Sequence, residues 1–354
     1  MKDKDKTTIY DISKKLNVSA ATVSRALNDS PKISASTKDL VLKTAREMNY
    51  KQNRLALALK SGKSNNVGVI VPYINRNFFS SVIRGIEEEL TPHGYHVIIC
   101  QTHENVEFEA EQINALLDTQ IDGIFMSVSK TTVNTDHIQK VIDQGTPLVF
   151  FDRKKEIAGV SAVTVDDFKG GFMATEHLIK QGCKRIAHFS GDLNLEIYTN
   201  RYEGYKAALK KYDIPYYTEL VMMVSSKIES GAAALAKLWE LKDKPDAIFS
   251  AGDHNALGAI QELRRKNVKI PEDICVVGFS NEPFTKYMEL PITSVDQTPQ
   301  IMGKIAAEVF LEQIEGKQTL TIEKKVVLTP ELCIRASSDR KGKSVKSASI
   351  LKAK

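Results

Sequence analysis

The chain has 354 residues, of which 42% are hydrophobic and 26% charged, and its net charge is +5. These values are typical of an ordinary globular protein of two or three domains, and they exclude a largely disordered chain, a collagen-like fibre and a small disulfide scaffold. No apolar run approaches the ~18 residues of a membrane helix, and MKDKDKTTIYD lacks the apolar core of a signal peptide. A cytoplasmic protein is therefore expected, and its four dispersed cysteines (Cys100, Cys183, Cys275 and Cys333) are expected to be reduced and mostly buried.

The charge is unevenly distributed along the chain. Residues 1–64 hold 14 Lys/Arg against 6 Asp/Glu, and residues 340–354 hold 6 Lys/Arg and no acid, whereas the segment between them is net acidic. A basic N-terminal segment on an acidic body indicates that this segment binds a polyanion, although charge alone leaves open a merely solvated, lysine-rich terminus. The basic tail, residues 339–354, shows no hydrophobic periodicity and is expected to be disordered.

Three short helices are predicted within residues 7–49. The first follows the capping residue Thr8, the second follows Ser19 and the third follows Ser34. Apolar residues recur at helical spacing in each of them. The residues expected to face inward are Ile9, Ile12, Leu16, Val23, Ala26, Leu27, Val41, Ala45 and Met48.

A turn of only three or four residues around Asn17 separates the first two helices, which is typical of a helix-turn-helix. In that motif the second helix enters the DNA major groove, where alanines contact thymine methyls and Arg25 can form two hydrogen bonds with guanine. A generic three-helix bundle is the alternative, and charge and spacing together disfavour it. The expected DNA contacts in this head are Thr8, Tyr10, Ser19, Ala20, Ala21, Thr22, Ser24, Arg25, Asn28, Ser34 and Thr37.

The segment TTIYDISKKLNVSAATVSRALND resembles the DNA-binding head of the LacI/GalR (lactose-repressor/galactose-repressor) family of bacterial regulators. The resemblance is carried by the VSxxTVSRxLN core and extends to about residue 338. It implies that residues 51–64 are a linker containing a hinge helix, which at about nine residues is too short to be stable unless it is held against DNA and the partner's hinge. It also implies that Leu59 wedges into the minor groove. The residues that would flank the wedge are Asn53, Arg54, Ala56 and Lys60, and Gln52 stands where the family usually has proline.

From residue 67 onward, apolar runs alternate with helical segments. The runs are VGVIVP, YHVIIC, DGIFMSV, PLVFFD, RIAHFSG, ELVMMVS, DAIFSAG and ICVVGFS. This pattern predicts parallel sheets covered by helices on both faces. A crossover near 163–182 and a return crossing with a late helix near 293–322 divide the runs into two lobes, in the manner of the type I periplasmic-binding-protein fold of the family's effector-binding body.

The predicted fold class is therefore α/β, with two doubly wound parallel sheets in the body. The predicted domains are the helix-turn-helix head (1–50), the hinge linker (51–64), the two-lobed effector-binding and dimerisation body (65–338) and the tail. Parallel sheets bind ligands at the carboxyl ends of their strands. The resemblance places effector contacts there at Phe78, Asp152, Leu195, Ile197, Arg201, Asp253 and Ser280.

These residue types suit a sugar, because carboxylates and guanidinium groups bind adjacent hydroxyls while an aromatic ring covers the apolar face. Ser280 departs from the pattern, since sugar-responsive relatives commonly carry aspartate there. Asp152 and Asp253 acting only as helix caps, and Arg201 only pairing with a neighbouring acid, remain the alternative. No catalytic or metal-binding motif is found, so no enzyme activity, cofactor or metal is expected.

The expected function is a homodimeric, sequence-specific transcription regulator, usually a repressor, that binds a pseudo-palindromic DNA operator. A small effector, expected to be a sugar, would control its operator affinity from between the lobes. Control by a phosphorylated partner protein, or by a nucleoside or nucleobase, remains the alternative. A solute-binding or transport protein would account for the body alone and is disfavoured by the DNA-binding head.

Overall fold

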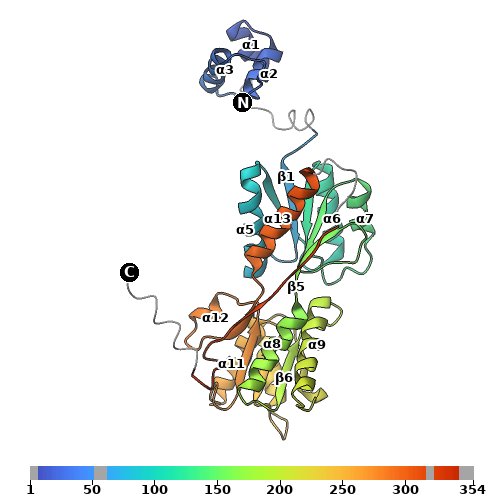
Figure 1. The fold of residues 1–354 in the computed structure, drawn as a ribbon, viewed down its shortest axis with the longest axis vertical. Coiled ribbons are helices and arrows are strands. Elements are labelled where there is room, and N and C mark those ends of the chain that lie inside the picture. The colour runs from blue at the N-terminus through green and yellow to red at the C-terminus, as the bar shows by residue number, and fades with distance from the viewer. Residues whose placement is uncertain (1–6, 52–61, 316–322, 343–354) are drawn as a thin grey trace, which may run out of the picture. The chain divides into compact units, whose positions relative to one another are not determined.

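The computed structural model describes residues 7–51, 62–315 and 323–342 (Figure 1). The chain forms two compact units, residues 1–64 and 65–354. The predicted hinge contacts lie outside the described residues, and so does most of the basic tail. Within the described ranges, no helix is long and apolar enough to cross a membrane. Cys100, Cys183 and Cys275 are buried and Cys333 is partly buried, and all four are free thiols.

The N-terminal unit contains α1 (Ile9–Leu16), α2 (Ala20–Leu27) and α3 (Ala35–Glu47), as predicted. Ser19 Oγ accepts a hydrogen bond from the Thr22 amide at 3.0 Å, and Ser34 Oγ accepts one from the Thr37 amide at 3.3 Å. Asn17 takes a left-handed conformation with φ 53°, which allows the tight turn between α1 and α2. All nine residues predicted to face inward lie in the core of this unit or pack against it.

The first lobe of the body is a six-stranded parallel sheet in the order β11-β5-β4-β3-β1-β2. Its strands are β1 (Asn66–Val71), β2 (His96–Gln101), β3 (Gly123–Met126), β4 (Leu148–Phe151), β5 (Ser161–Val165) and β11 (Lys325–Leu328). Helices α5 (Asn77–Leu90) and α13 (Pro299–Glu315) cover one face, while α6 (Val106–Asp118) and α7 (Asp136–Asp143) cover the other. A 3₁₀ turn, η1 (Thr91–His93), follows α5.

The second lobe repeats this plan in the order β12-β10-β9-β8-β6-β7. Its strands are β6 (Ile186–Ser190), β7 (Val221–Met223), β8 (Ala247–Ser250), β9 (Cys275–Phe279), β10 (Thr293–Asp296) and β12 (Glu331–Cys333). Helices α8 (Asp167–Lys180) and α9 (Glu196–Lys211) cover one face, and α10 (Ile228–Leu238) and α11 (Asp253–Arg265) cover the other. A short 3₁₀ helix, η2 (Thr218–Leu220), and a short α-helix, α12 (Phe284–Tyr287), complete it.

The chain crosses between the lobes three times: from β5 to α8, from β10 to α13, and from β11 to β12. The first two crossings were predicted, but the third, residues 329–330, was not. All eight predicted strands occur, whereas β5, β10, β11 and β12 were not predicted as strands. The pairing of β10 with β12 is antiparallel, so the second sheet is mostly rather than wholly parallel.

Helices α8 and α9 pack closely, as α5 does against α13 and α10 against α11, and this packing positions Arg201. A Cβ atom at Gly171 of α8 would lie 2.2 Å from the carbonyl oxygen of Arg201, and one at Gly204 of α9 would lie 2.1 Å from that of Phe168. Such distances exclude any side chain at either position unless the helices move apart. The two glycines therefore allow α9, which carries Arg201, to lie this close to α8.

Candidate functional site

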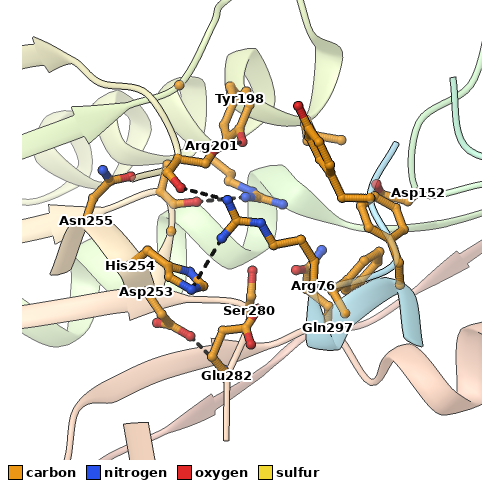
Figure 2. A pocket seen from close by; sticks show the side chains of 18 of the residues that line it. Arg76, Asp152, Tyr198, Arg201, Asp253, His254, Asn255, Ser280, Glu282 and Gln297 are labelled. Carbon is orange, nitrogen blue, oxygen red and sulfur yellow. Dashed lines mark hydrogen bonds between the residues drawn. The ribbon is translucent and has the colours of Figure 1, made fainter. Parts of the chain in front are cut away.

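The carboxyl ends of strands from both lobes surround one cavity of ≈ 140 Å³ in the body (Figure 2). Six of the seven residues predicted to contact an effector line this cavity: Phe78, Asp152, Ile197, Arg201, Asp253 and Ser280. The seventh, Leu195, does not line it and instead faces an adjacent depression beside Lys154 and Lys325. The predicted strand ends therefore converge from both lobes.

Arg201 is 3% exposed and already pairs within the protein. Its Nε donates to Asp167 Oδ1 at 2.7 Å, and its Nη1 donates to the carbonyl of Ala251 at 2.9 Å. Its guanidinium also stacks 3.7 Å above the ring of Phe279. Pairing with a neighbouring acid was the alternative for Arg201, and the structure contains that pair. Because a guanidinium has five N–H donors, the pairing leaves donors for a ligand.

Two buried carboxyl groups near Arg201 have raised pKa values. Burial raises the pKa of Asp167 to about 6, even though Arg201 lies beside it. Burial also raises the pKa of Asp152, whose Oδ2 accepts a hydrogen bond of 3.3 Å from Ser127 Oγ and lies 3.8 Å from Arg153 Nε. The backbone of Asp152 has φ 60°, a conformation that non-glycine residues adopt mostly where the surrounding structure holds them in place.

Asp253 begins α11 and is 1% exposed. Its Oδ1 accepts from Ser294 Oγ at 2.7 Å, and its Oδ2 accepts from the Glu282 amide at 2.8 Å. Burial nevertheless raises its pKa to about 7, against the effect of these hydrogen bonds. Asp253 therefore ties the first turn of α11 to β10 and to the loop after β9, besides facing the cavity.

Residues outside the predicted set of contacts also line the cavity, among them Arg76, His254, Glu282 and Gln297. Arg76 immediately precedes α5, and Figure 2 shows its guanidinium reaching toward His254. Its Nη1 lies 3.3 Å from His254 Nε2, and its Nη2 donates to the carbonyl of Ser226 at 3.0 Å. Glu282 lies only two residues beyond the predicted Ser280, so the strand-end pattern came close to it. No comparable signal marks Arg76 in the segment YINRNFF.

In the N-terminal unit, the predicted DNA contacts lie on or near the surface. Ser19, Ala21, Arg25 and Asn28 are exposed, and Tyr10 is 66% exposed. Ser19 and Ser34 also cap α2 and α3, so their hydroxyls have a structural role besides any contact with phosphate. The predicted contacts on α1 and α2 thus present polar side chains together with the guanidinium of Arg25. Among the described residues, no group of His, Cys, Asp and Glu is arranged to hold a metal ion.

Two family models match the chain. The model described as "Bacterial regulatory proteins, lacI family" matches residues 8–53, and the model described as "Periplasmic binding proteins and sugar binding domain of LacI family" matches residues 64–332. The match to the second model covers most of the body, including every element that lines the cavity.

Individual relatives match over nearly their whole length. The chain is 32% identical to catabolite control protein A of Priestia megaterium, over 91% of this chain and 96% of the relative. It is 31% identical to the NTD biosynthesis operon regulator NtdR of Bacillus subtilis (strain 168), over 94% and 99%. Among solved structures, a complex of the transcriptional regulator CelR with cellobiose has a TM-score of 0.69 at 28% identity, over 94% of this chain and 99% of that chain.

Proposed function

The chain belongs to the LacI family of bacterial regulatory proteins, and from this premise we propose which of its residues bind DNA and which bind the effector. It is a DNA-binding transcriptional regulator, and the relatives that it matches are regulators rather than enzymes. We infer further that it acts in the cytoplasm, as a homodimer on a pseudo-palindromic operator, and represses transcription. Two heads would then read half-sites about one helical turn apart.

In the head, α2 is the proposed recognition helix. Arg25 is exposed and its guanidinium makes no hydrogen bond or ion pair with another described residue, so it is available to a guanine in the major groove. Ala20 and Ala21 would contact thymine methyls. The remaining polar residues position the head on phosphates. These are Thr8, Tyr10, Ser19, Thr22, Ser24, Asn28, Ser34 and Thr37.

The linker from residue 51 to 64 is proposed as the hinge, with Leu59 as the wedge in the minor groove and Asn53, Arg54, Ala56 and Lys60 beside it. Replacing Leu59 with alanine should then reduce both operator affinity and the bend angle of the DNA, since an apolar wedge kinks the duplex. Unchanged affinity and bending would refute this assignment.

The effector is proposed to be a sugar that binds in the cavity between the lobes. The observation that supports this most directly is the convergence of Asp152, Arg201, Asp253 and Phe78 at the strand ends of both lobes. Carboxylates, a guanidinium and an aromatic ring are what a polyhydroxylated ring needs for recognition. Because the two lobes contribute, an effector would change their relative closure, and it can do so only through different affinities for the two states.

The test is a melting experiment on the whole protein with neutral sugars, sugar phosphates, nucleosides and nucleobases. A ligand at 100 times its dissociation constant stabilises the folded state by about 2.7 kcal/mol, which is readily measured. A sugar that raises the melting temperature and also changes operator affinity would support the proposal. A nucleobase with these effects would replace the sugar assignment. No shift with any compound would refute small-ligand control, and a search for a phosphorylated protein partner would follow.

A further inference from the structure

The loop that follows β9 contributes Ser280 and Glu282 to the cavity wall, and its backbone is strained (Figure 2). Ser280 has φ 105° and the next residue, Asn281, has φ 50°. Residues other than glycine adopt such angles at a cost in free energy, and they keep them only where the surrounding structure holds them. Two side chains therefore reach the cavity only as long as other contacts keep this loop in its conformation.

Hydrogen bonds from Arg335 hold this loop on both sides of Glu282. Arg335 Nη2 donates to Asn281 Oδ1 at 2.6 Å, and its Nη1 donates to Thr285 Oγ1 at 3.1 Å and to the carbonyl of Ile292 at 2.7 Å. The Thr285 hydroxyl donates in turn to the carbonyl of Glu282 at 2.7 Å. A guanidinium suits this role, because its donors point in fixed directions and reach several acceptors at once.

Arg335 is itself fixed to the core of the second lobe, behind the cavity wall. It follows β12, and its amide donates to Thr293 Oγ1 at 2.8 Å. The same hydroxyl donates to the carbonyl of Arg335 at 2.9 Å, and Thr293, the first residue of β10, is fully buried. Among the described residues, the cavity wall includes neither Arg335 nor Asn281. Any effect of Arg335 on a ligand in the cavity must therefore be indirect.

Asn281 extends these hydrogen bonds to the crossings between the lobes. Its Nδ2 donates to Asp296 Oδ2 at 2.8 Å, and Asp296 is the last residue of β10. Asp296 Oδ1 accepts from the amide of Thr298, at the start of the crossing to α13, at 2.7 Å. Arg335 lies just beyond β12, into which the third crossing leads. The loop is thus joined to two of the three segments that connect the lobes.

We propose that Arg335 is a positioning residue for effector binding, and that it acts through the side chain of Asn281. Its hydrogen bonds hold the loop after β9 in the conformation that places Ser280 and Glu282 at the cavity wall. This inference rests on the proposed function, since it assumes that the cavity is the effector site. Because the same hydrogen bonds reach two crossings, an effector that fixes the loop would also favour one arrangement of the lobes.

The first measurement needs no ligand. Hydrogen–deuterium exchange of the whole protein, measured on peptides that span residues 279–287, should be at least about tenfold faster in Arg335→Ala than in the wild type. Exchange in β8 of the same lobe should be unchanged, which separates a loosened loop from a loosened fold. Unchanged exchange of the loop would overturn the proposal.

The matched control is Arg340→Ala. Arg340 belongs to the same segment after β12, but it donates to the carbonyls of Pro271 at 2.7 Å and Asp273 at 3.2 Å, at the amino end of β9. Its loss should speed exchange near residues 271–274 and leave the loop after β9 unchanged. If Arg340→Ala loosened that loop equally, Arg335 would have no special role, and the proposal would be overturned.

A second variant, Asn281→Gly, removes the side chain that Arg335 holds while glycine still tolerates the positive φ. It should loosen the loop as Arg335→Ala does, and it decides the matter if Arg335→Ala fails to fold. The double variant should lose no more than the larger of the two single losses, because both interrupt one set of hydrogen bonds. Losses that add would show that Arg335 does not act through Asn281, and would overturn the proposal.

The second measurement is calorimetric titration with glucose, ribose, cellobiose and hypoxanthine, at a temperature where every variant is folded. A probe that binds the wild type should bind Arg335→Ala and Asn281→Gly about tenfold or more weakly, and Arg340→Ala with unchanged affinity. Unchanged affinity in Arg335→Ala would overturn the proposal while the effector site survives. If no probe binds the wild type, the proposed function fails instead, and the exchange measurement still decides whether Arg335 positions the loop.

Discussion

Arg76 Nη1 lies 3.3 Å from Nε2 of His254, and this contact joins the two lobes across the cavity. Arg76 precedes α5 of the first lobe, whereas His254 lies in the first turn of α11 in the second. A second contact between the lobes, from Lys154 Nζ to Glu196 Oε2 at 3.4 Å, lies at the adjacent depression. Arg76 thus links the lobes at the wall of the cavity, so an effector that binds there as proposed would be coupled to lobe closure through this side chain.

Replacing Arg76 with alanine should favour a more open arrangement of the lobes, because the hydrogen bonds to His254 and to the Ser226 carbonyl are lost. Small-angle X-ray scattering of the whole protein should record a larger radius of gyration than for the wild type. The matched control is Arg84→Ala, an exposed arginine of α5 that pairs with Glu88 and should change nothing. Identical scattering from Arg76→Ala and the wild type would show that other contacts set lobe closure.

The contact also predicts a dependence on pH. An arginine stays protonated, so His254 can accept its hydrogen bond only when the imidazole is neutral. Burial, and next the charge of Arg76, lowers the pKa of His254. Its contribution to stability is therefore present above the ordinary histidine pKa of ~6.5 and is lost as the pH falls through the lower folded value. Scattering should show the lobes opening on acidification in that range, and His254→Asn should show no such transition.

The neighbouring residue, Asp253, titrates in the opposite sense. Its folded pKa of about 7 lies above its ordinary value of 3.8, so the folded state binds the proton more tightly than the unfolded chain does. Its contribution to stability is thus fully present below pH ~4 and is lost as the pH rises through about 7. The free energy of unfolding of the wild type, relative to Asp253→Asn, should therefore decline over this range and level off above it. A difference independent of pH would contradict the raised pKa.

The sequence pattern predicted the lobes well because a buried parallel strand reads as a continuous apolar run. It missed β5, β10, β11 and β12, which lie at the crossings between lobes, where short strands carry no such run. The third crossing consists of residues 329–330 alone, which are too few to show a recognisable composition or periodicity in the sequence. Tertiary pairing with neighbouring strands, rather than local preference, makes these segments into strands.

The strand-end pattern accounts for Asp152, Asp253 and Ser280, whereas Phe78, Ile197 and Arg201, which lie in α5 and α9, were expected only from the family resemblance. Asp152 follows β4 immediately and Asp253 follows β8 after two residues, and both line the cavity. Arg76 reaches the cavity from a loop by means of a long side chain, and Glu282 reaches it because positive φ angles redirect the loop after β9. The pairing of Arg201 with Asp167 depends on how α8 packs against α9 and cannot be read from spacing along the chain.

That packing gives a prediction about a glycine. Gly171→Ala would place a Cβ atom 2.2 Å from the carbonyl oxygen of Arg201, so α8 and α9 must separate. Overpacking of this kind costs about 1–3 kcal/mol, and the displaced Arg201 should also bind the effector more weakly. Gly145→Ala is the comparison: it has open space but φ 72°, so it should lower stability without affecting the ligand. Denaturation and ligand titration of both variants separate the two effects.

Arg25 leads to a prediction about which DNA bases the N-terminal head recognises. If its guanidinium forms two hydrogen bonds with one guanine, Arg25→Ala should cost about 1–3 kcal/mol at that base pair and little at the others. The measurement is a binding selection from randomised duplexes, followed by titration of the selected operator and its single-base variants. Lys43→Ala, which removes one exposed charge from α3, should leave the selected sequence unchanged. A uniform loss of affinity across all duplexes with Arg25→Ala would mean that this residue contacts phosphate, because phosphate contacts carry no sequence information.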